Sequence, residues 1–246
     1  MLKYAAATPV VLSLPSLPVM AAPTAAASAI TGMTVFLDPG HNGANDASIS
    51  RQVTNGRGGT KECQTSGTTT PDGYPEHTFN WEVVLGIRAA LTQYGVRTAM
   101  SRGNDNALGP CVDQRAAMAN ALHPDAIVSI HADGGPPDGS GFHVNYSSPP
   151  LNAAQSGPAV RFAQVMRDQL VRAGLQPSTY RGTDGLYGRA DLAGLNLAQY
   201  PSILIELGNM RNAAEASVME SAAGRSRYSA AVVNGIVAYL QGGSGG

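Results

Sequence analysis

Short apolar runs alternate along this chain with segments of helical periodicity, and no other feature constrains the fold as strongly. The expected strands cover residues 34–37, 96–100, 125–131, 142–146 and 202–206. The expected helices cover residues 76–94 and 113–122, about 160–170 and about 225–240. Strands that alternate with helices favour a mainly parallel sheet, and such a sheet is normally covered on both faces. We therefore predict a single α/β domain, with a mainly parallel central sheet and helices on both faces.

The charge of the chain argues against nucleic acid as a partner. There are 16 Lys and Arg residues against 17 Asp and Glu residues, which gives a formal net charge of −1. A protein that binds nucleic acid normally carries a basic surplus or a basic stripe. The balanced charge and the lack of coiled-coil heptads also give no reason to expect more than a monomer.

The N-terminal segment has the pattern of a secretory signal peptide. A short basic start is followed by an apolar stretch that ends near Met20 and by small residues at 21–27. Pro9, Pro15 and Pro18 make a membrane-spanning helix a poor alternative. The predicted organisation is therefore a signal peptide, a folded domain and a flexible tail, at residues 1–27, 28–241 and 242–246. The exported chain would reach the periplasm, the cell wall or the extracellular space, and it has no polybasic patch for a stable membrane anchor.

Export changes the interpretation of the two cysteines, Cys63 and Cys111. Outside the cytosol they can persist as a disulfide. In the loop-entropy model such a bridge contributes about 4 kcal/mol to the free energy of unfolding. Two buried free thiols are the alternative. Neither cysteine belongs to a C-x-x-C motif, so redox catalysis is not expected.

Residues able to bind a metal or move a proton follow the ends of three predicted strands. His41 follows the first strand, His131 ends the third and Glu206 ends the last. Glu76 opens the helix after the first strand, and helix starts in this topology face the same edge of the sheet. Because ligands bind beyond the carboxyl ends of the strands in such sheets, we expect the four side chains to converge on one rim.

Each of these residues alone is weak evidence, because a histidine at a strand end is often structural and a glutamate at a helix start often serves the dipole. Glu206 is harder to dismiss, since a carboxylate at the end of a buried strand needs a partner or a role. Two histidines and one carboxylate suit catalytic zinc, and a further carboxylate nearby can act as general base. His143 lies on the polar side of its predicted strand, where a structural role is favoured over contact with substrate.

Three blocks of sequence then occur in a recognisable order. The first is VFLDPGH at 35–41 with Glu76 and Asn80; the second is Ser101-Arg102, Arg115, Ala119-Asn120 and AIVSIHA at 126–132; the third is PSILIELG at 201–208 with Asn212. Together they resemble the zinc-dependent N-acetylmuramoyl-L-alanine amidases of the Amidase_3 type, over about residues 34–240.

The resemblance implies that His41, Glu76 and His131 hold one Zn²⁺ ion and that Glu206 is the catalytic glutamate. The implied reaction is hydrolysis of the amide that joins N-acetylmuramic acid to the first L-Ala of the peptide stem. The implied partner is peptidoglycan or its muropeptide fragments, and residues 28–241 would form a stand-alone catalytic domain.

The sequence departs from the family pattern in the 34 residues between His41 and Glu76, which are rich in Gly and Thr. They predict a substrate-contacting flap partly tied by the disulfide, or alternatively a passive insertion. Asp133 stands where asparagine is usual, and the arginine often found upstream of the closing block is Arg181 or Arg189. Two other functions stay open, namely a zinc hydrolase acting on another envelope amide and a non-catalytic envelope-binding protein on the same fold.

Overall fold

The computed structural model describes residues 29–243. The predicted signal peptide at residues 1–27 lies outside the described residues, as do residues 244–246 of the predicted tail. The last helix, α8, spans Ala222–Gly243 and includes two glycines that we expected in the tail. Within residues 29–243, no helix combines the length and the apolar character needed to cross a membrane.

Six strands form the central sheet, in the order β4-β1-β5-β8-β6-β7. Their bounds are Thr34–Pro39 (β1), Arg97–Met100 (β4), Ala126–Asp133 (β5), His143–Ser147 (β6), Leu186–Arg189 (β7) and Ser202–Asn209 (β8). Strands β4, β1, β5 and β8 are parallel to one another, whereas β6 is antiparallel to β8 and parallel to β7. The predicted mainly parallel sheet is confirmed. The sequence did not predict β7, because this short strand contains a glycine and lacks a continuous apolar run.

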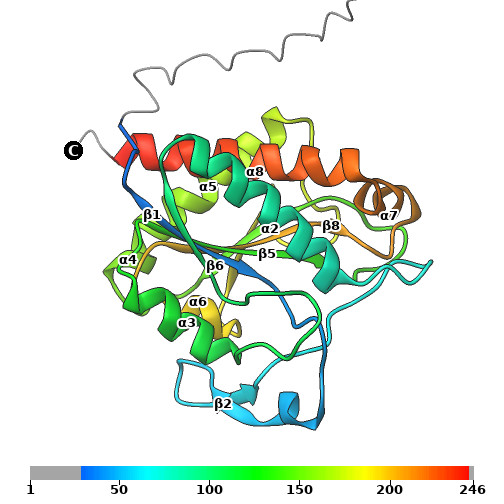
Figure 1. Ribbon diagram of the computed structural model, residues 1–246, viewed down its shortest axis with the longest axis horizontal. Coiled ribbons are helices and arrows are strands. Elements are labelled where there is room, and N and C mark those ends of the chain that lie inside the picture. The colour runs from blue at the N-terminus through cyan, green and yellow to red at the C-terminus, as the bar shows by residue number, and fades with distance from the viewer. Residues whose placement is uncertain (1–28, 244–246) are drawn as a thin grey trace, which may run out of the picture.

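Helices cover both faces of the sheet, as predicted (Figure 1). One face carries α2 (Glu76–Gln93) and α5 (Pro158–Arg172), which pack on the strands, and α8, which packs on both of these helices. The other face carries the shorter pair α3 (Val112–Ala121) and α6 (Ala193–Leu197). Two further short helices are α4 (Ala153–Ser156) and α7 (Ala213–Glu220).

Alternation along the strands gives the sheet an apolar face and a more polar face. The apolar face joins the main core under α2, α5 and α8 through Val35, Leu37, Val128, Ile130, Ile203 and Ile205. The opposite face carries a much smaller core, in which Phe36 and Ile127 meet Ala119 of α3. Asp38, Ser129, His131 and Glu206 share the register of that second face. The sheet therefore places its polar residues where little apolar core competes for the space.

The long segment between β1 and α2 has structure of its own. It contains a short 3₁₀ helix, η1 (Ala47–Ser50), and an antiparallel hairpin of β2 (Gln52–Thr54) and β3 (Thr60–Glu62). A disulfide joins Cys63, just after the hairpin, to Cys111, which precedes α3. The predicted pairing is confirmed, and the alternative of two free thiols is wrong.

Candidate active site

Three of the four side chains expected at the rim form a tight cluster at the carboxyl edge of the sheet. His41 lies in the turn after β1, Glu76 is the first residue of α2 and His131 lies near the end of β5. Each contributes one ligand atom, and these atoms lie within 4.8 Å of one another. We call His41, Glu76 and His131 the metal cluster below.

The His41 ring is oriented by a backbone contact from the segment before α2. Its Nδ1 donates to the carbonyl oxygen of Thr65 at 2.8 Å, which leaves Nε2 to face the other two side chains. Nε2 lies 3.0 Å from Glu76 Oε2. His41 also adopts a left-handed backbone, with φ of 62°. A histidine whose second nitrogen donates to a carbonyl is the usual arrangement for a metal ligand.

Glu76 is buried, and both of its oxygens have partners. Oε1 faces His131 Nδ1 at 2.9 Å and accepts from the backbone of Ala132 and the side chain of Asn80. Oε2 accepts from the backbone of Thr68 at 3.0 Å. Burial alone would raise the pKa of Glu76, but the two histidines outweigh it and hold that pKa well below the usual range. The carboxylate is therefore kept charged and fixed in position.

The segment at 65–68 lies directly against the metal cluster. At Gly67, whose φ is 80°, an added Cβ would lie 2.8 Å from Glu76 Oε2 and 2.9 Å from the His41 ring. Only glycine leaves this approach open. Two imidazoles and one carboxylate held in this way are compatible with a metal ion, and the donor set is one that zinc prefers.

Glu206 lies next to the metal cluster in the register of the sheet. His131 on β5 pairs with Glu206 on β8, which in turn pairs with His143 on β6. Gly40 lies next to His131 on the other side of this row, so close that an added Cβ there would lie 2.2 Å from the His131 ring. The four residues therefore cross the sheet side by side on one face.

The electrostatic environment of Glu206 is opposite to that of Glu76. Burial raises the pKa of Glu206 well above its usual range, and the negative charges of Glu76 and Asp133 add to the effect. Arg189 offsets part of it. Among the described residues, Oε2 of Glu206 has no hydrogen-bond partner. A carboxyl group of this kind holds a proton more readily than an ordinary glutamate does.

A comparison with protein families identifies the chain. The family model described as N-acetylmuramoyl-L-alanine amidase (Amidase_3) matches residues 35–238. The chain belongs to this amidase family.

Relatives of similar length support the same assignment. The protein described as N-acetylmuramoyl-L-alanine amidase Rv3717 of Mycobacterium tuberculosis is 67% identical over 91% of this chain and 92% of that protein. The crystal structure of the amidase Ami1 from Mycobacterium smegmatis has a TM-score of 0.85 and 70% identity, over 86% of this chain and 98% of that chain. The apo form of Ami1 from Mycobacterium abscessus has a TM-score of 0.85 and 67% identity, over 86% of this chain and 100% of that chain.

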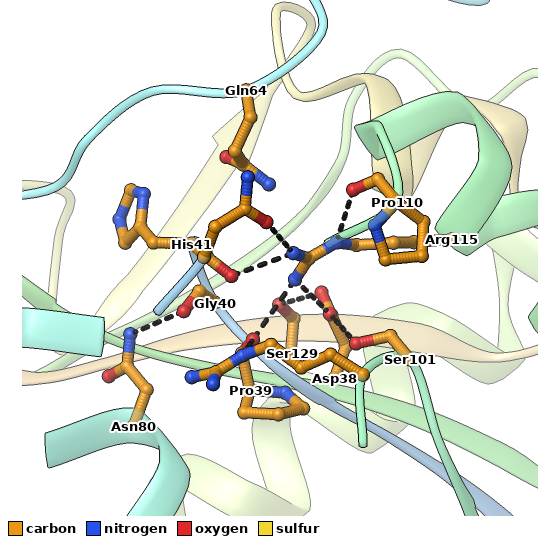
Figure 2. Close-up of polar contacts among 12 residues, drawn as sticks. Asp38, Pro39, Gly40, His41, Gln64, Asn80, Ser101, Pro110, Arg115 and Ser129 are labelled. Carbon is orange, nitrogen blue, oxygen red and sulfur yellow. Dashed lines mark hydrogen bonds and ion pairs between the residues drawn. The ribbon is translucent and has the colours of Figure 1, made fainter. Parts of the chain in front are cut away.

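Behind the metal cluster, this amidase-family chain has a buried network centred on Arg115 of α3 (Figure 2). The guanidinium donates to Asp38 Oδ1 at 2.8 Å and to the carbonyl oxygen of His41 at 2.7 Å. Its remaining acceptors are the carbonyls of Pro39 and Pro110 and the side chain of Asn42. Arg115 therefore ties together the turn that carries His41.

Asp38 is the anionic partner in that network. Burial would raise its pKa, but Arg115 and the hydroxyls of Ser101 and Ser129 outweigh it and lower the pKa of Asp38 to about 2. The two hydroxyls donate to Asp38 at 2.5 and 2.6 Å. In the sequence, Arg115 and Ser101 are recognisable only as parts of a motif, and nothing there assigns a role to Asp38. A charged residue inside the first apolar strand was the signal that could have found it.

The structure also revises our interpretation of His143. The sequence placed it on the polar side of its predicted strand, but the residue is only 2% exposed. It lies opposite Glu206 because β6 runs antiparallel to β8, a pairing that the sequence pattern did not indicate.

A cavity of about 130 Å³ adjoins the metal cluster on the polar face of the sheet. Its wall includes His41 and His131, apolar residues of the second core such as Phe36 and Ile127, and Leu195 of α6. Room for a bound group therefore exists beside the candidate metal ligands.

Proposed function

We propose that this protein is a peptidoglycan hydrolase that cleaves the amide between N-acetylmuramic acid and the L-Ala of the peptide stem. One observation carries the proposal: a His-Glu-His cluster lies beside a buried carboxylate, in a chain of the N-acetylmuramoyl-L-alanine amidase family. In this proposal His41, Glu76 and His131 hold one Zn²⁺ ion. When bound, zinc acidifies a water molecule and polarises the amide carbonyl.

Glu206 is the proposed general base and general acid. Its carboxylate takes the proton from the attacking water and delivers it to the departing amine nitrogen. The raised pKa of Glu206 supports both tasks, because the group holds a proton more readily than an ordinary glutamate. Arg115 and the backbone of Thr65 keep the His41 imidazole in place through this exchange.

The proposed setting is the cell envelope. Export would depend on residues 1–27, and the Cys63–Cys111 disulfide is typical of an oxidising compartment. The proposed partner is peptidoglycan or a muropeptide fragment, and the chain would act as a monomer. We also assign the segment 42–75 to contact with substrate rather than to a passive insertion, because residues 65–68 border the metal cluster.

The test is digestion of purified peptidoglycan followed by mass spectrometry of the new ends. We expect muramic acid freed of its stem and peptides that begin with an unblocked L-Ala. Chelation should abolish the release, added Zn²⁺ should restore it, and metal analysis should find zinc at one ion per chain. Cleavage of a different amide would favour another envelope hydrolase. Tight binding with no cleavage would favour the non-catalytic alternative.

A further inference from the structure

His143 stands out among the histidines because it faces the same site from the far side of Glu206. The antiparallel pairing of β6 with β8 sets His143 directly opposite Glu206. Directly paired residues project to the same face of a sheet. Since neighbouring strands lie about 4.8 Å apart, Glu206 has the metal cluster on one side and His143 on the other.

The His143 imidazole is buried without a partner for its Nδ1 atom. The side chain is 2% exposed, and among residues 29–243 no group is hydrogen-bonded to Nδ1. The edges of Tyr180 and Tyr187 pack against the ring, with centroids 6.4 and 5.9 Å away. A buried polar atom left unpaired destabilises the fold, so a purely structural role would be served better by an apolar ring of the same shape.

The imidazole is also uncharged at neutral pH. The pKa of His143 is lowered to about 4, chiefly by burial and to a smaller extent by Arg189 and Arg181, while Asp133 opposes them. A neutral imidazole offers one donor and one acceptor. An amide group, which also has one of each, is its natural complement.

We propose that His143 is a further catalytic residue, which hydrogen-bonds an amide group of the substrate on the side of Glu206 away from the metal cluster. The inference rests on the proposed amidase function and deepens it. The substrate supplies the imidazole with a hydrogen-bond partner that no residue among 29–243 gives it.

The sharpest test compares His143→Phe with His143→Gln in the full zinc-loaded chain. Phe removes both nitrogens but keeps the ring, so the thermal midpoint should stay unchanged or rise. The kcat/KM for a soluble muropeptide should fall about 10- to 100-fold. Gln keeps a donor and an acceptor and should recover part of the loss. The control is His123→Gln at an outlying histidine bonded to Tyr200, which should leave activity unchanged.

Binding provides a readout that does not depend on turnover. In a Glu206→Gln background, calorimetry should show that His143→Phe weakens muropeptide binding about 10-fold or more, while zinc content stays constant. Substrates shortened in the stem, or lacking the N-acetyl group, then locate the amide. The effect of His143→Phe should disappear for the substrate that lacks the contacted group.

The proposal fails if His143→Phe binds and cleaves the muropeptide as well as the wild type does. It also fails if His143→Phe lowers stability while His143→Gln keeps full activity and affinity, because the residue would then be structural. Failure of the proposed function is a separate result, in which the wild-type chain itself releases no stem from peptidoglycan.

Discussion

The two halves of the candidate site treat buried polar atoms in opposite ways. In the metal cluster, both oxygens of Glu76 have partners, and its pKa is held low. On the neighbouring strands β8 and β6, Glu206 and His143 each keep a buried polar atom with no partner among the described residues, and the pKa of Glu206 is raised. A fully bonded group suits a resident ion, which needs fixed ligands. A polar group without a partner suits a substrate site, because a bound substrate can supply the missing hydrogen bonds.

The largest expected effect separates the two halves by replacing one glutamate at a time. Glu206→Gln removes the proton carrier and should lower kcat about 10²- to 10⁴-fold, with zinc content unchanged. Glu76→Gln removes a proposed metal ligand and should lower zinc content itself. Steady-state kinetics on muropeptides and metal analysis after gel filtration measure both outcomes. Retained activity in Glu206→Gln would remove that residue from its proposed role.

The second prediction concerns the Cys63–Cys111 disulfide, which anchors the chain just before residues 65–68, the segment that contacts the metal cluster. The double variant Cys63→Ser/Cys111→Ser should lower the free energy of unfolding by about 4 kcal/mol. It should also weaken zinc affinity, because Thr65 and Thr68 orient His41 and Glu76. Activity per bound zinc should change little, since Glu206 and His143 do not contact this segment in any hydrogen bond we find among the described residues.

Urea titration and competition with a zinc chelator test this prediction. The matched control is Ser66→Ala, at an exposed position of the same segment that leaves the disulfide intact. It should change neither the free energy of unfolding nor the zinc affinity. Equal loss of activity per bound zinc would show that the segment serves both halves of the site.

Site residues at the ends of parallel strands and at a helix start could be predicted from the sequence far better than the rest of the site. Strand ends and a helix start place His41, Glu76, His131 and Glu206 at one rim, because a parallel sheet brings such ends together. The position of His143 depends on β6 running antiparallel to β8, and tertiary packing rather than local pattern decides that direction. The contacts of residues 65–68 could not be predicted from the sequence either, because they use backbone groups that every residue has.

A third prediction tests the network behind the metal cluster through its pH dependence. The pKa of Asp38 is about 2 in the folded chain against an ordinary 3.8. A lowered carboxyl pKa stabilises the fold above pH 3.8, and this contribution is lost as the pH falls towards 2. The difference of about 1.8 pKa units corresponds to about 2.5 kcal/mol.

Asp38→Asn should therefore lower the free energy of unfolding by about 2.5 kcal/mol or more at pH 7, because Arg115 also loses its anionic partner. The gap between Asp38→Asn and the wild type should narrow below pH 4. Denaturation curves at several pH values measure it, with exposed Asp72→Asn as the control. A gap that does not depend on pH would mean that the charge of Asp38 contributes nothing.

The smallest expected effect gives the cleanest contrast between the two halves, because it concerns stability alone. Burial raises the pKa of Glu206, so the folded state binds the carboxyl proton more tightly than the unfolded state does. Stability carried by that proton is lost as the pH rises, and at neutral pH the charge of Glu206 opposes folding. Glu206→Gln should therefore stabilise the metal-free chain by about 1 kcal/mol at pH 7, and the gain should shrink towards pH 4.5.

Glu76→Gln should destabilise the same metal-free chain, because both oxygens of the Glu76 carboxylate are hydrogen-bonded. Calorimetric unfolding of both variants after chelation tests the pair, and a loss of stability in Glu206→Gln would mean that its carboxylate is held as firmly as that of Glu76.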